Sequence, residues 1–420
     1  MPRICLITGA PLCRNPRVVK EASALSEAGY DVKVLGPVFT DEVARQDEQI
    51  LDSVSWQRIV TADLRSSQAP VWRRLWWRGV RRLATEACYR LNWETPYGLG
   101  YGLRRTLHRA RQVEADLYIG HQETGAWVAT QLLREGHCVG ADFEDWYARD
   151  LLPEAQATRP IELLETCEAA LLKHSAHATT TSHALASALA DRYDAPKPAV
   201  VYNAFPWSDR DNLDGQYHDR DNTERPSLHW FSQTIGPGRG LDTLCKALRR
   251  VDCPVDVHLR GNVSSDFEAH LSNSFPDEFR EHRLFLHDLV HPTELMSRIA
   301  EHDIGLALEQ PRPPSRNLTI TNKILQYVLG GLAVIATPTT GQMEVADATP
   351  ESVFLCEGYD ADSLAAKIQD LAVSSKRLHN AQKAALNAAE ETFCWEQQVP
   401  RLVASVDRAL SMPAQSSTAS

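Results

Sequence analysis

The chain has 420 residues, of which 43% are hydrophobic and 24% charged, the composition of a soluble globular protein. A single hydrophobic core rarely grows that large, so we expect two domains of about 200 residues each. No apolar run reaches the roughly 18 residues that a membrane-spanning helix needs. Nine scattered cysteines without a C-x-x-C spacing indicate neither a disulfide framework nor a zinc site, and they favour the cytoplasm.

Charge is spread very unevenly along the chain. The net charge is −11, yet residues 70–112 hold ten Arg, no Lys and two Glu, a balance of +8, so the remaining residues sum to −19. In this segment Trp72, Leu75 and Trp76 share one helical face. The helix could lie on an anionic membrane surface, or it could pack its Trp side chains inward. The residues that would make the membrane contact are Trp72, Arg73, Arg74, Trp76, Trp77 and Arg78.

No motif supports nucleic-acid binding, so we expect none. The expected location is the cytoplasm, with peripheral attachment to the inner face of the membrane as the alternative that residues 70–112 leave open.

The first half alternates between strand and helix patterns. An apolar run at 4–8 is broken at Gly9, a helical pattern follows to residue 28, and a second apolar run occupies 31–35. This order of strand, glycine turn, helix and strand is typical of a parallel sheet. Further predicted strands are 116–120, 138–143, 178–182 and 199–201, and further predicted helices are 162–173 and 184–193.

The second half repeats this alternation after a polar stretch at 208–225 that has no apolar pattern. Its predicted strands are 228–231, 255–259, 285–286, 304–308, 333–336 and 351–355. We therefore expect an α/β protein in which two Rossmann-like domains face each other across a cleft. The expected parts are an N-terminal acceptor-binding domain (1–205), a linker (206–227), a C-terminal donor-binding domain (228–395), a closing helix that crosses back to the first domain (396–410) and a disordered tail (411–420).

Two places in the second half could bind an anion. Gly236 and Gly238 lie in the turn GPGRG, which follows a strand and carries Arg239, so backbone N–H groups could approach a diphosphate. Asn322 and Lys323 open a helix that Gly330-Gly331 ends, and the helix dipole favours an anion at that start. A plain turn and a solvated Lys are the alternative interpretations.

Polar residues also follow two strands of the first half. His121 ends one of them, and Asp142 and Glu144 end the next, at the edge where open parallel sheets bind ligands. The carboxylates could hold a metal or sugar hydroxyls, or they could cap a helix. His282, His287 and His291 have no metal spacing, so we expect them at the surface and predict no metal site.

Several segments in order resemble the GT-B nucleotide-sugar glycosyltransferases, in particular retaining glycosyltransferase family 4. These segments are RVVKEA followed by AGYDVKVLG, GHQETG, ADFEDWYARDLL, GPGRGLDTL, NKILQYVLGGLAVIAT and TFCWEQQV. The resemblance covers residues 3–410 except 40–115 and 208–225. It implies sugar transfer from a nucleoside diphosphate sugar to a glycan, lipid-linked or small-molecule acceptor, with retention of anomeric configuration and without a metal or other cofactor.

The resemblance also implies roles for individual residues. The catalytic group would be His121, Arg239 and Lys323. The donor-binding group would be Gly9, Gly236, Gly238, Arg239, Asn322, Lys323 and Gln326. The acceptor-binding group would be Arg17, Asp142 and Glu144.

The chain departs from the family pattern at four positions. Leu318 and Gln326 stand where the family commonly has two glutamates, Thr234 stands where it has an Arg, and Ala333 where it has a Pro. Gln326 could still hydrogen-bond a ribose as a neutral group. These departures leave two alternatives open, a non-catalytic scaffold that binds a nucleotide or glycan and a sugar-nucleotide 2-epimerase.

Overall fold

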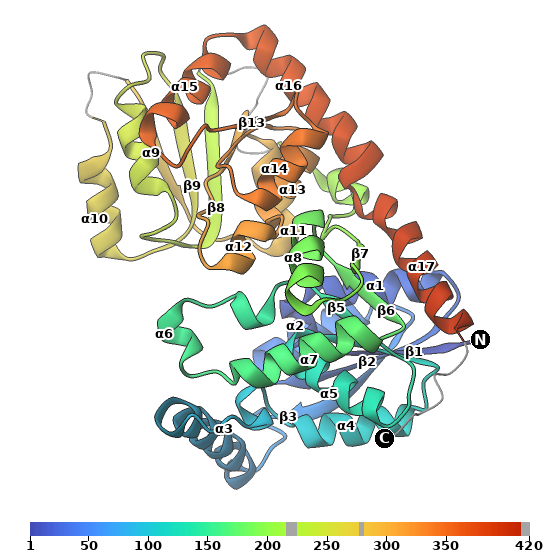
Figure 1. Ribbon diagram of the computed structural model, residues 1–420. Helices are drawn as coiled ribbons and strands as arrows, with labels where there is room; N and C mark the ends of the chain where they lie inside the picture. The colour runs from blue at the N-terminus through green and yellow to red at the C-terminus, as the bar shows by residue number, and fades with distance from the viewer. Residues whose placement is uncertain (216–224, 277–280, 413–420) are drawn as a thin grey trace. The chain divides into compact units, whose positions relative to one another are not determined.

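The computed structural model describes residues 1–215, 225–276 and 281–412. The chain forms two compact units, Met1–Val201 with Val399–Ser420, and Tyr202–Gln398. Each unit is a parallel sheet covered by helices (Figure 1), so the prediction of two Rossmann-like domains is confirmed. The expected linker lies partly outside the described residues, as does most of the expected tail.

The first unit contains a seven-stranded parallel sheet in the order β3-β2-β1-β4-β5-β6-β7. Its strands are β1 (Arg3–Ile7), β2 (Asp31–Val38), β3 (Gln57–Asp63), β4 (Leu117–His121), β5 (Val139–Phe143), β6 (His177–Thr180) and β7 (Ala199–Val200). Its α-helices are α1 (Pro16–Glu27), α2 (Asp41–Leu51), α3 (Val71–Leu91), α4 (Leu103–Val113), α5 (Gln122–Arg134), α6 (Pro153–Gln156), α7 (Ile161–His174) and α8 (His183–Tyr193). The strand order reverses between β1 and β4, and such a switch point is where open sheets bind ligands.

The second unit contains a six-stranded parallel sheet in the order β10-β9-β8-β11-β12-β13. Its strands are β8 (Ser227–Ile235), β9 (Asp256–Val263), β10 (Arg283–His287), β11 (Ile304–Ala307), β12 (Ala333–Ala336) and β13 (Val353–Leu355). Its α-helices are α9 (Leu241–Leu248), α10 (Ser265–Ser274), α11 (Pro292–Ala300), α12 (Pro314–Leu318), α13 (Asn322–Gly330), α14 (Thr340–Ala348), α15 (Ala361–Ala372) and α16 (Ser375–Ala388). The switch point of this sheet lies between β8 and β11.

Local sequence explains where α1 and α13 begin and end. Asn15 caps α1 by accepting a hydrogen bond from the backbone N–H of Val18, and Pro16 occupies the first helical position, where no N–H is needed. Gly331 ends α13 with φ of 71°, a left-handed conformation that glycine adopts without strain. Local sequence thus sets the start of α1 and the end of α13.

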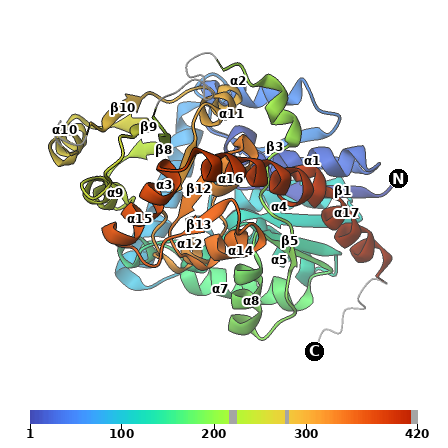
Figure 2. The ribbon, with the colours of Figure 1, turned by 90° about the horizontal axis from the view of Figure 1, so that it is seen from above.

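The C-terminal helix α17 (Trp395–Ser411) returns the chain to the first unit at Val399, as the sequence predicts. Leu402 and Val406 are fully buried, and Ser405 lies 3.0 Å from the imidazole Nδ1 of His177 in β6. The Tyr30 hydroxyl donates to Asp407. Both views show this helix beside β1 and the N-terminus (Figures 1 and 2).

Some elements differ from the expectation. The sequence predicts neither α2 nor β3. Most residues of β3 are half-buried, so the strand carries only a weak apolar pattern. His282 is 9% exposed, and its Nε2–H donates to the Leu248 carbonyl at 3.0 Å, so its expected surface position is wrong. Among the described residues, no helix combines the length and apolar character needed to cross a bilayer.

Candidate functional site

The switch point of the first sheet brings together four residues that the sequence singles out. Arg17 lies in the first turn of α1, His121 ends β4, and Asp142 lies near the end of β5, followed by Glu144. The carboxyl ends of neighbouring parallel strands meet at one edge of the sheet, so these side chains converge although up to 127 positions separate them. Gly9, which follows β1, lies at the same edge.

Arg17 is the buried centre of this cluster, which we call the switch-point charge cluster (Arg17, Glu21, His121, Asp142 and Glu144). Its guanidinium donates to both carboxylate oxygens of Asp142, at 2.9 and 2.8 Å, and to the Val201 carbonyl at 2.7 Å. It also forms an ion pair with Glu21, at 2.9 Å from Nε to Oε1. Arg17 is 0% exposed, so it supports its neighbours here, and its contact with an acceptor stays a prediction.

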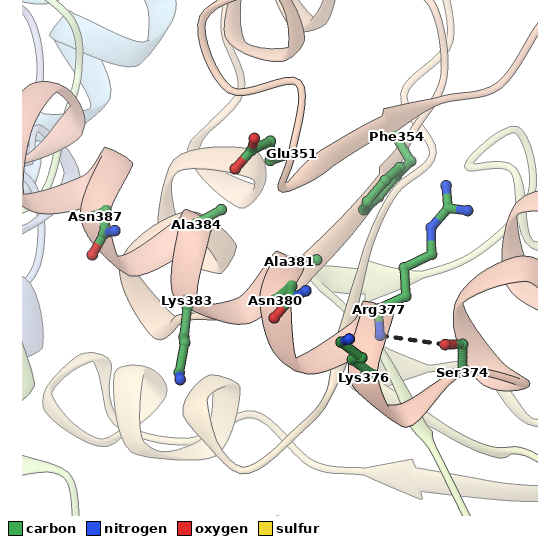
Figure 3. A pocket seen from close by; sticks show the side chains of 10 residues that line it. All are labelled: Glu351, Phe354, Ser374, Lys376, Arg377, Asn380, Ala381, Lys383, Ala384 and Asn387. Carbon is green, nitrogen blue, oxygen red and sulfur yellow. Dashed lines mark hydrogen bonds between the residues drawn. The ribbon is translucent and has the colours of Figure 1, made fainter.

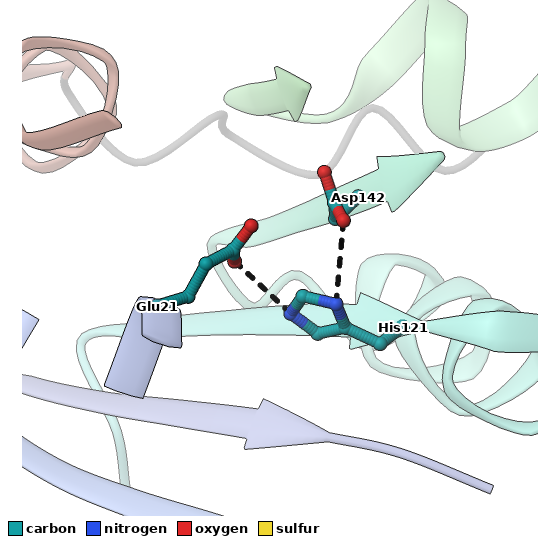
Figure 4. Close-up of side chains that lie close together, drawn as sticks. All are labelled: Glu21, His121 and Asp142. Atoms are coloured by element: carbon teal, nitrogen blue, oxygen red, sulfur yellow. Dashed lines mark ion pairs between the residues drawn. The ribbon is translucent and has the colours of Figure 1, made fainter. Parts of the chain in front are cut away.

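His121 is also 0% exposed, and carboxylates face both of its ring nitrogens. Its Nε2 lies 3.3 Å from Glu21, and its Nδ1 lies 3.5 Å from Asp142 (Figure 4). The Nδ1 also lies 3.5 Å from Glu144. Burial by itself would lower the pKa of His121, but Glu21, Asp142 and Glu144 together raise that pKa well above its usual value. The raised pKa favours the protonated imidazole, and a protonated imidazole does not act as a general base.

Asp142 is buried, and both of its carboxylate oxygens accept hydrogen bonds. It accepts a hydrogen bond from the Thr179 hydroxyl at 2.6 Å in addition to the two from Arg17. Burial would raise the pKa of Asp142, but the charges of Arg17 and His121 hold it well below its usual range. Asp142 is thus a permanent anion that orients two cations, and its proposed contact with an acceptor stays a prediction.

Glu21, His121 and Asp142 offer ligand atoms within 4.8 Å of one another, close enough for a metal ion. However, Arg17 already forms ion pairs with the carboxylates of both Glu21 and Asp142. The carboxylates of the cluster therefore neutralise Arg17, which explains their position without a bound metal. The sequence analysis missed Glu21 as a site residue. Its signal is the i, i+4 pair of charges, Arg17 and Glu21, on the inward apolar face of α1.

Glu144 is the member of the cluster that reaches solvent, with 17% of its side chain exposed. Asn15 donates to it at 3.3 Å. Nearby, Gln122 adopts φ of 59° and its backbone N–H donates to the Tyr147 hydroxyl at 3.0 Å. At Gly9, a Cβ would lie 2.7 Å from the Thr124 hydroxyl oxygen, so close packing against α5 requires glycine there.

In the second unit, the loop from Gly236 to Gly240 leaves the end of β8 and opens α9. Gly238 and Gly240 have φ of 71° and 81°, which glycine adopts without strain. At Gly236, a Cβ would meet only the Thr234 methyl at 3.8 Å, so neither packing nor backbone conformation requires glycine. Arg239 is exposed and donates to the Ser232 hydroxyl at 3.0 Å. An anion could approach this backbone closely.

The N-terminus of α13 lies at the same edge of the second sheet. Its cap residue Thr321 makes no capping hydrogen bond, so N–H groups of the first turn have no side-chain acceptor at the cap. Exposed Asn322 accepts a hydrogen bond from Asn203 at 3.2 Å. Lys323 forms an ion pair with Glu309, at 2.5 Å from Nζ to Oε1, and lies 5.5 Å from the centre of the Trp230 ring. Sequence reasoning missed Glu309, which lies two residues after the end of β11, because an acid near a strand end does not by itself indicate its partner.

Gln326 lies one turn further along α13 and is 8% exposed. Leu318 ends α12 and is half-buried. Contact between Gln326 and a ribose therefore stays a prediction that depends on its small exposed surface.

A pocket of about 590 Å³ lies elsewhere in the second unit, between β13 and α16 (Figure 3). It is lined by Glu351, Phe354, Ser374, Lys376, Arg377, Asn380, Ala381, Lys383, Ala384 and Asn387. None of the residues predicted from the sequence belongs to it, so the candidate site rests on the two switch points.

Two Rossmann-like units, each with polar groups at its switch point, are the architecture of the GT-B class, which includes nucleotide-sugar glycosyltransferases. Searches found no matching family model and no matching curated protein. Solved structures do match. Sucrose-phosphate synthase from Thermosynechococcus elongatus is similar with a TM-score of 0.66 at 14% identity, covering 97% of this chain and 99% of that one.

Two further solved structures are similar over nearly the whole chain. Anabaena HepE in complex with UDP-glucose has a TM-score of 0.64 at 16% identity, covering 97% of this chain and 100% of that one. A putative UDP-N-acetylglucosamine 2-epimerase from Listeria monocytogenes has a TM-score of 0.58 at 12% identity, covering 97% and 96%. At these identities the likeness establishes the GT-B fold and leaves the reaction to be argued from the residues.

Proposed function

We propose that this protein is a glycosyltransferase that moves a sugar from a nucleoside diphosphate sugar to an acceptor, with retention of anomeric configuration. The observation that carries the proposal is the edge of the second sheet, where the Gly236–Gly240 loop, Arg239 and the uncapped start of α13 present N–H groups and a cation. Charge develops on the departing diphosphate in such a reaction, and these groups are suited to stabilise it.

The proposal also covers the nucleobase of the donor sugar nucleotide. Since HepE was solved with UDP, with UDP and glucose, and with UDP-glucose, we propose a uridine diphosphate sugar as the first donor to test. A thermal-shift screen with UDP, GDP and their sugars would rank the candidates, because a ligand that binds only the folded state raises the unfolding midpoint.

The switch-point charge cluster has a supporting part in this proposal. Arg17, Glu21 and Asp142 hold His121 as a buried cation, and His121 in turn lies beside Glu144. We assign the contact with a sugar or acceptor hydroxyl to Glu144, because its carboxylate is the part of the cluster that reaches solvent. His121 would contact the transferred sugar only if Glu144 shifts away from its Nδ1. A glycan or lipid-linked molecule is the proposed acceptor.

Replacement of Arg239 tests the proposal. Arg239→Ala should lower kcat/KM for sugar transfer by on the order of tenfold or more, because one charge-stabilising donor is lost at the leaving group. Arg250→Ala is the matched control, since Arg250 is an exposed cation just beyond the far end of α9 that forms an ion pair with exposed Asp362. Equal activity in Arg239→Ala and the control would refute the role of this loop.

Two other functions predict different results. The epimerase alternative is favoured by the likeness to the Listeria protein, and it requires conversion of a UDP-sugar without any acceptor. The scaffold alternative is favoured by Leu318 and Gln326, which replace the two acids of the family pattern. It requires UDP binding by calorimetry together with the absence of both transfer and hydrolysis. Product analysis with and without acceptors separates all three.

A further inference from the structure

The helix α3 carries an apolar stripe on its outward side. Trp72, Leu75, Trp76 and Leu83 recur at helical spacing and are 71%, 61%, 65% and 72% exposed. The alternative in which these Trp side chains pack inward is therefore wrong for Trp72 and Trp76. Single exposed apolar residues are normal, but a stripe of this size on one helix marks an interaction surface.

The opposite side of α3 holds it to the first unit. Ala84 and Cys88 are each 7% exposed, and half-buried Trp77 lies on the same side of the helix. The Cys88 thiol lies 3.2 Å from the Arg159 carbonyl. The structure thus corrects the predicted contact set, since Trp77 belongs to the inward side. Figure 1 shows α3 at the outside of the first unit.

The charge of α3 identifies what would cover the stripe. Between Val71 and Leu91 the helix has six Arg and one Glu. Arg78 and Arg82 are exposed and lie beside the stripe, one turn apart. A second copy of this chain is a poor occupant, because a twofold contact would place the same Arg-rich faces against each other. An acidic surface with an apolar interior satisfies both the cations and the Trp side chains.

We propose that the outward face of α3 docks onto a lipid bilayer that contains anionic headgroups. Trp72, Leu75, Trp76 and Leu83 enter the boundary between headgroups and acyl chains, where indole rings are favoured, while Arg78 and Arg82 contact lipid phosphates. The docked helix lies in the plane of the surface and does not cross the membrane. This inference is independent of the proposed sugar transfer.

Flotation of the full-length protein with lipid vesicles tests the proposal. The protein should bind phosphatidylcholine vesicles that contain phosphatidylglycerol and should bind pure phosphatidylcholine vesicles much more weakly, and added salt should reduce the difference. Arg78→Gln/Arg82→Gln should weaken binding roughly thirtyfold, since each basic residue near an anionic surface contributes a factor of about five. The matched control is Arg104→Gln/Arg105→Gln, which removes the same charge from exposed positions of α4.

The apolar contribution needs its own variant. Trp72→Ala/Trp76→Ala should also lose vesicle binding, and brominated lipids should quench tryptophan emission in the wild type more than in this variant. Unfolding midpoints of all variants should match the wild type, because the replaced side chains are exposed. Absence of binding to anionic vesicles overturns the proposal, as does equal loss in the α4 control. Self-association that the α3 variants abolish would identify a second copy as the occupant and would also overturn it.

Discussion

Arg17 and Asp142 form a bidentate ion pair across the switch point of the first sheet, with both side chains fully buried. The pair joins the first turn of α1 to β5, 125 positions later. Because Asp142 also accepts a hydrogen bond from Thr179 and faces His121, one carboxylate fixes three elements of the unit. The charge of this carboxylate is what makes the buried cations tolerable.

The first prediction concerns this pair. Arg17→Ala should lower the free energy of unfolding by about 3 to 5 kcal/mol, because Asp142 and Glu21 are left buried without their shared cation. Arg14→Ala, at an exposed position just before the same helix, should change stability by no more than about 0.5 kcal/mol. Urea denaturation measures both. A loss below about 1 kcal/mol in Arg17→Ala would contradict a buried, fully paired Arg17.

The second prediction concerns the edge of the second sheet where α13 begins, and it rests on the proposed function. Lys323→Ala should weaken UDP binding by on the order of tenfold, because a cation beside the start of α13 is lost. Glu309→Gln should bind UDP at least as tightly as the wild type, because it removes the anion that competes for Lys323. Isothermal titration measures both, with exposed Lys246→Ala on α9 as control. Unchanged affinity in Lys323→Ala would remove this residue from the donor site.

The third prediction concerns Glu168 in α7. Burial raises the pKa of this carboxyl to about 7, partly offset by hydrogen bonds from Tyr193 and from the Ala148 N–H. A raised folded-state pKa means that its stabilising contribution is present below pH 4.5 and is lost as pH rises through about 7. Glu168→Gln, a neutral side chain of the same shape, should remove that loss.

Unfolding free energies of wild type and Glu168→Gln between pH 4 and 8 test this assignment. The difference in stability should grow in favour of the variant as pH rises, whereas Glu162→Gln, exposed on the same helix, should show no such trend. A constant difference across that range would show that Glu168 does not titrate there.

The fourth prediction concerns a row of histidines in the second unit. His229 in β8 stacks on His302 at 4.5 Å between ring centres, and His302 lies 4.4 Å from His258, which stacks on His287 at 5.2 Å. Burial lowers the pKa of His229 well below 6.5, and the nearby charges of Arg260, His258 and His287 lower it further. Among the described residues, neither ring nitrogen of His229 has a hydrogen-bond partner, so protonation is not compensated.

A histidine whose pKa is lowered by folding makes the protein less stable as pH falls. As pH falls below about 6.5, the unfolded chain takes up a proton that folded His229 rejects, so stability should decline. His229→Phe keeps the ring stacking and should reduce the acid decline, while His379→Phe at an exposed position should leave it unchanged. Thermal midpoints measured from pH 7 to pH 5 check this. An acid decline of equal slope in His229→Phe and wild type would show that other groups cause it.

Local patterns in the sequence predicted much of the fold. The apolar run at 333–336 predicts β12 at its observed bounds, and the runs that predict β1, β4 and β5 agree with the observed strands to within one or two residues. Burial on both faces of a parallel sheet requires continuous apolar runs, which makes such strands visible in a single sequence. By contrast, β3 at the sheet edge was missed because its residues are only half-buried.

The sequence predicts where the candidate site lies, but it predicts only some of the contacts between its residues. The carboxyl ends of strands follow from strand order along the chain, so His121, Asp142 and Glu144 could be named. The partner of Lys323 could not, because nothing in the local pattern distinguishes Glu309 from any other acid after a strand. The amphipathic pattern of α3 was visible as well, but a stripe of Trp and Leu reads the same whether it faces a core or a bilayer.

The sequence by itself therefore determined the alternation of strands and helices, the two-domain plan and the positions of the polar strand ends, because these depend on neighbours in the chain. The tertiary structure decided which charges pair, that Arg17 and His121 are buried cations held by Glu21 and Asp142, and that the Trp72 side of α3 faces outward. The Arg17–Asp142 pair, for example, joins residues 125 positions apart that meet only when the sheet forms.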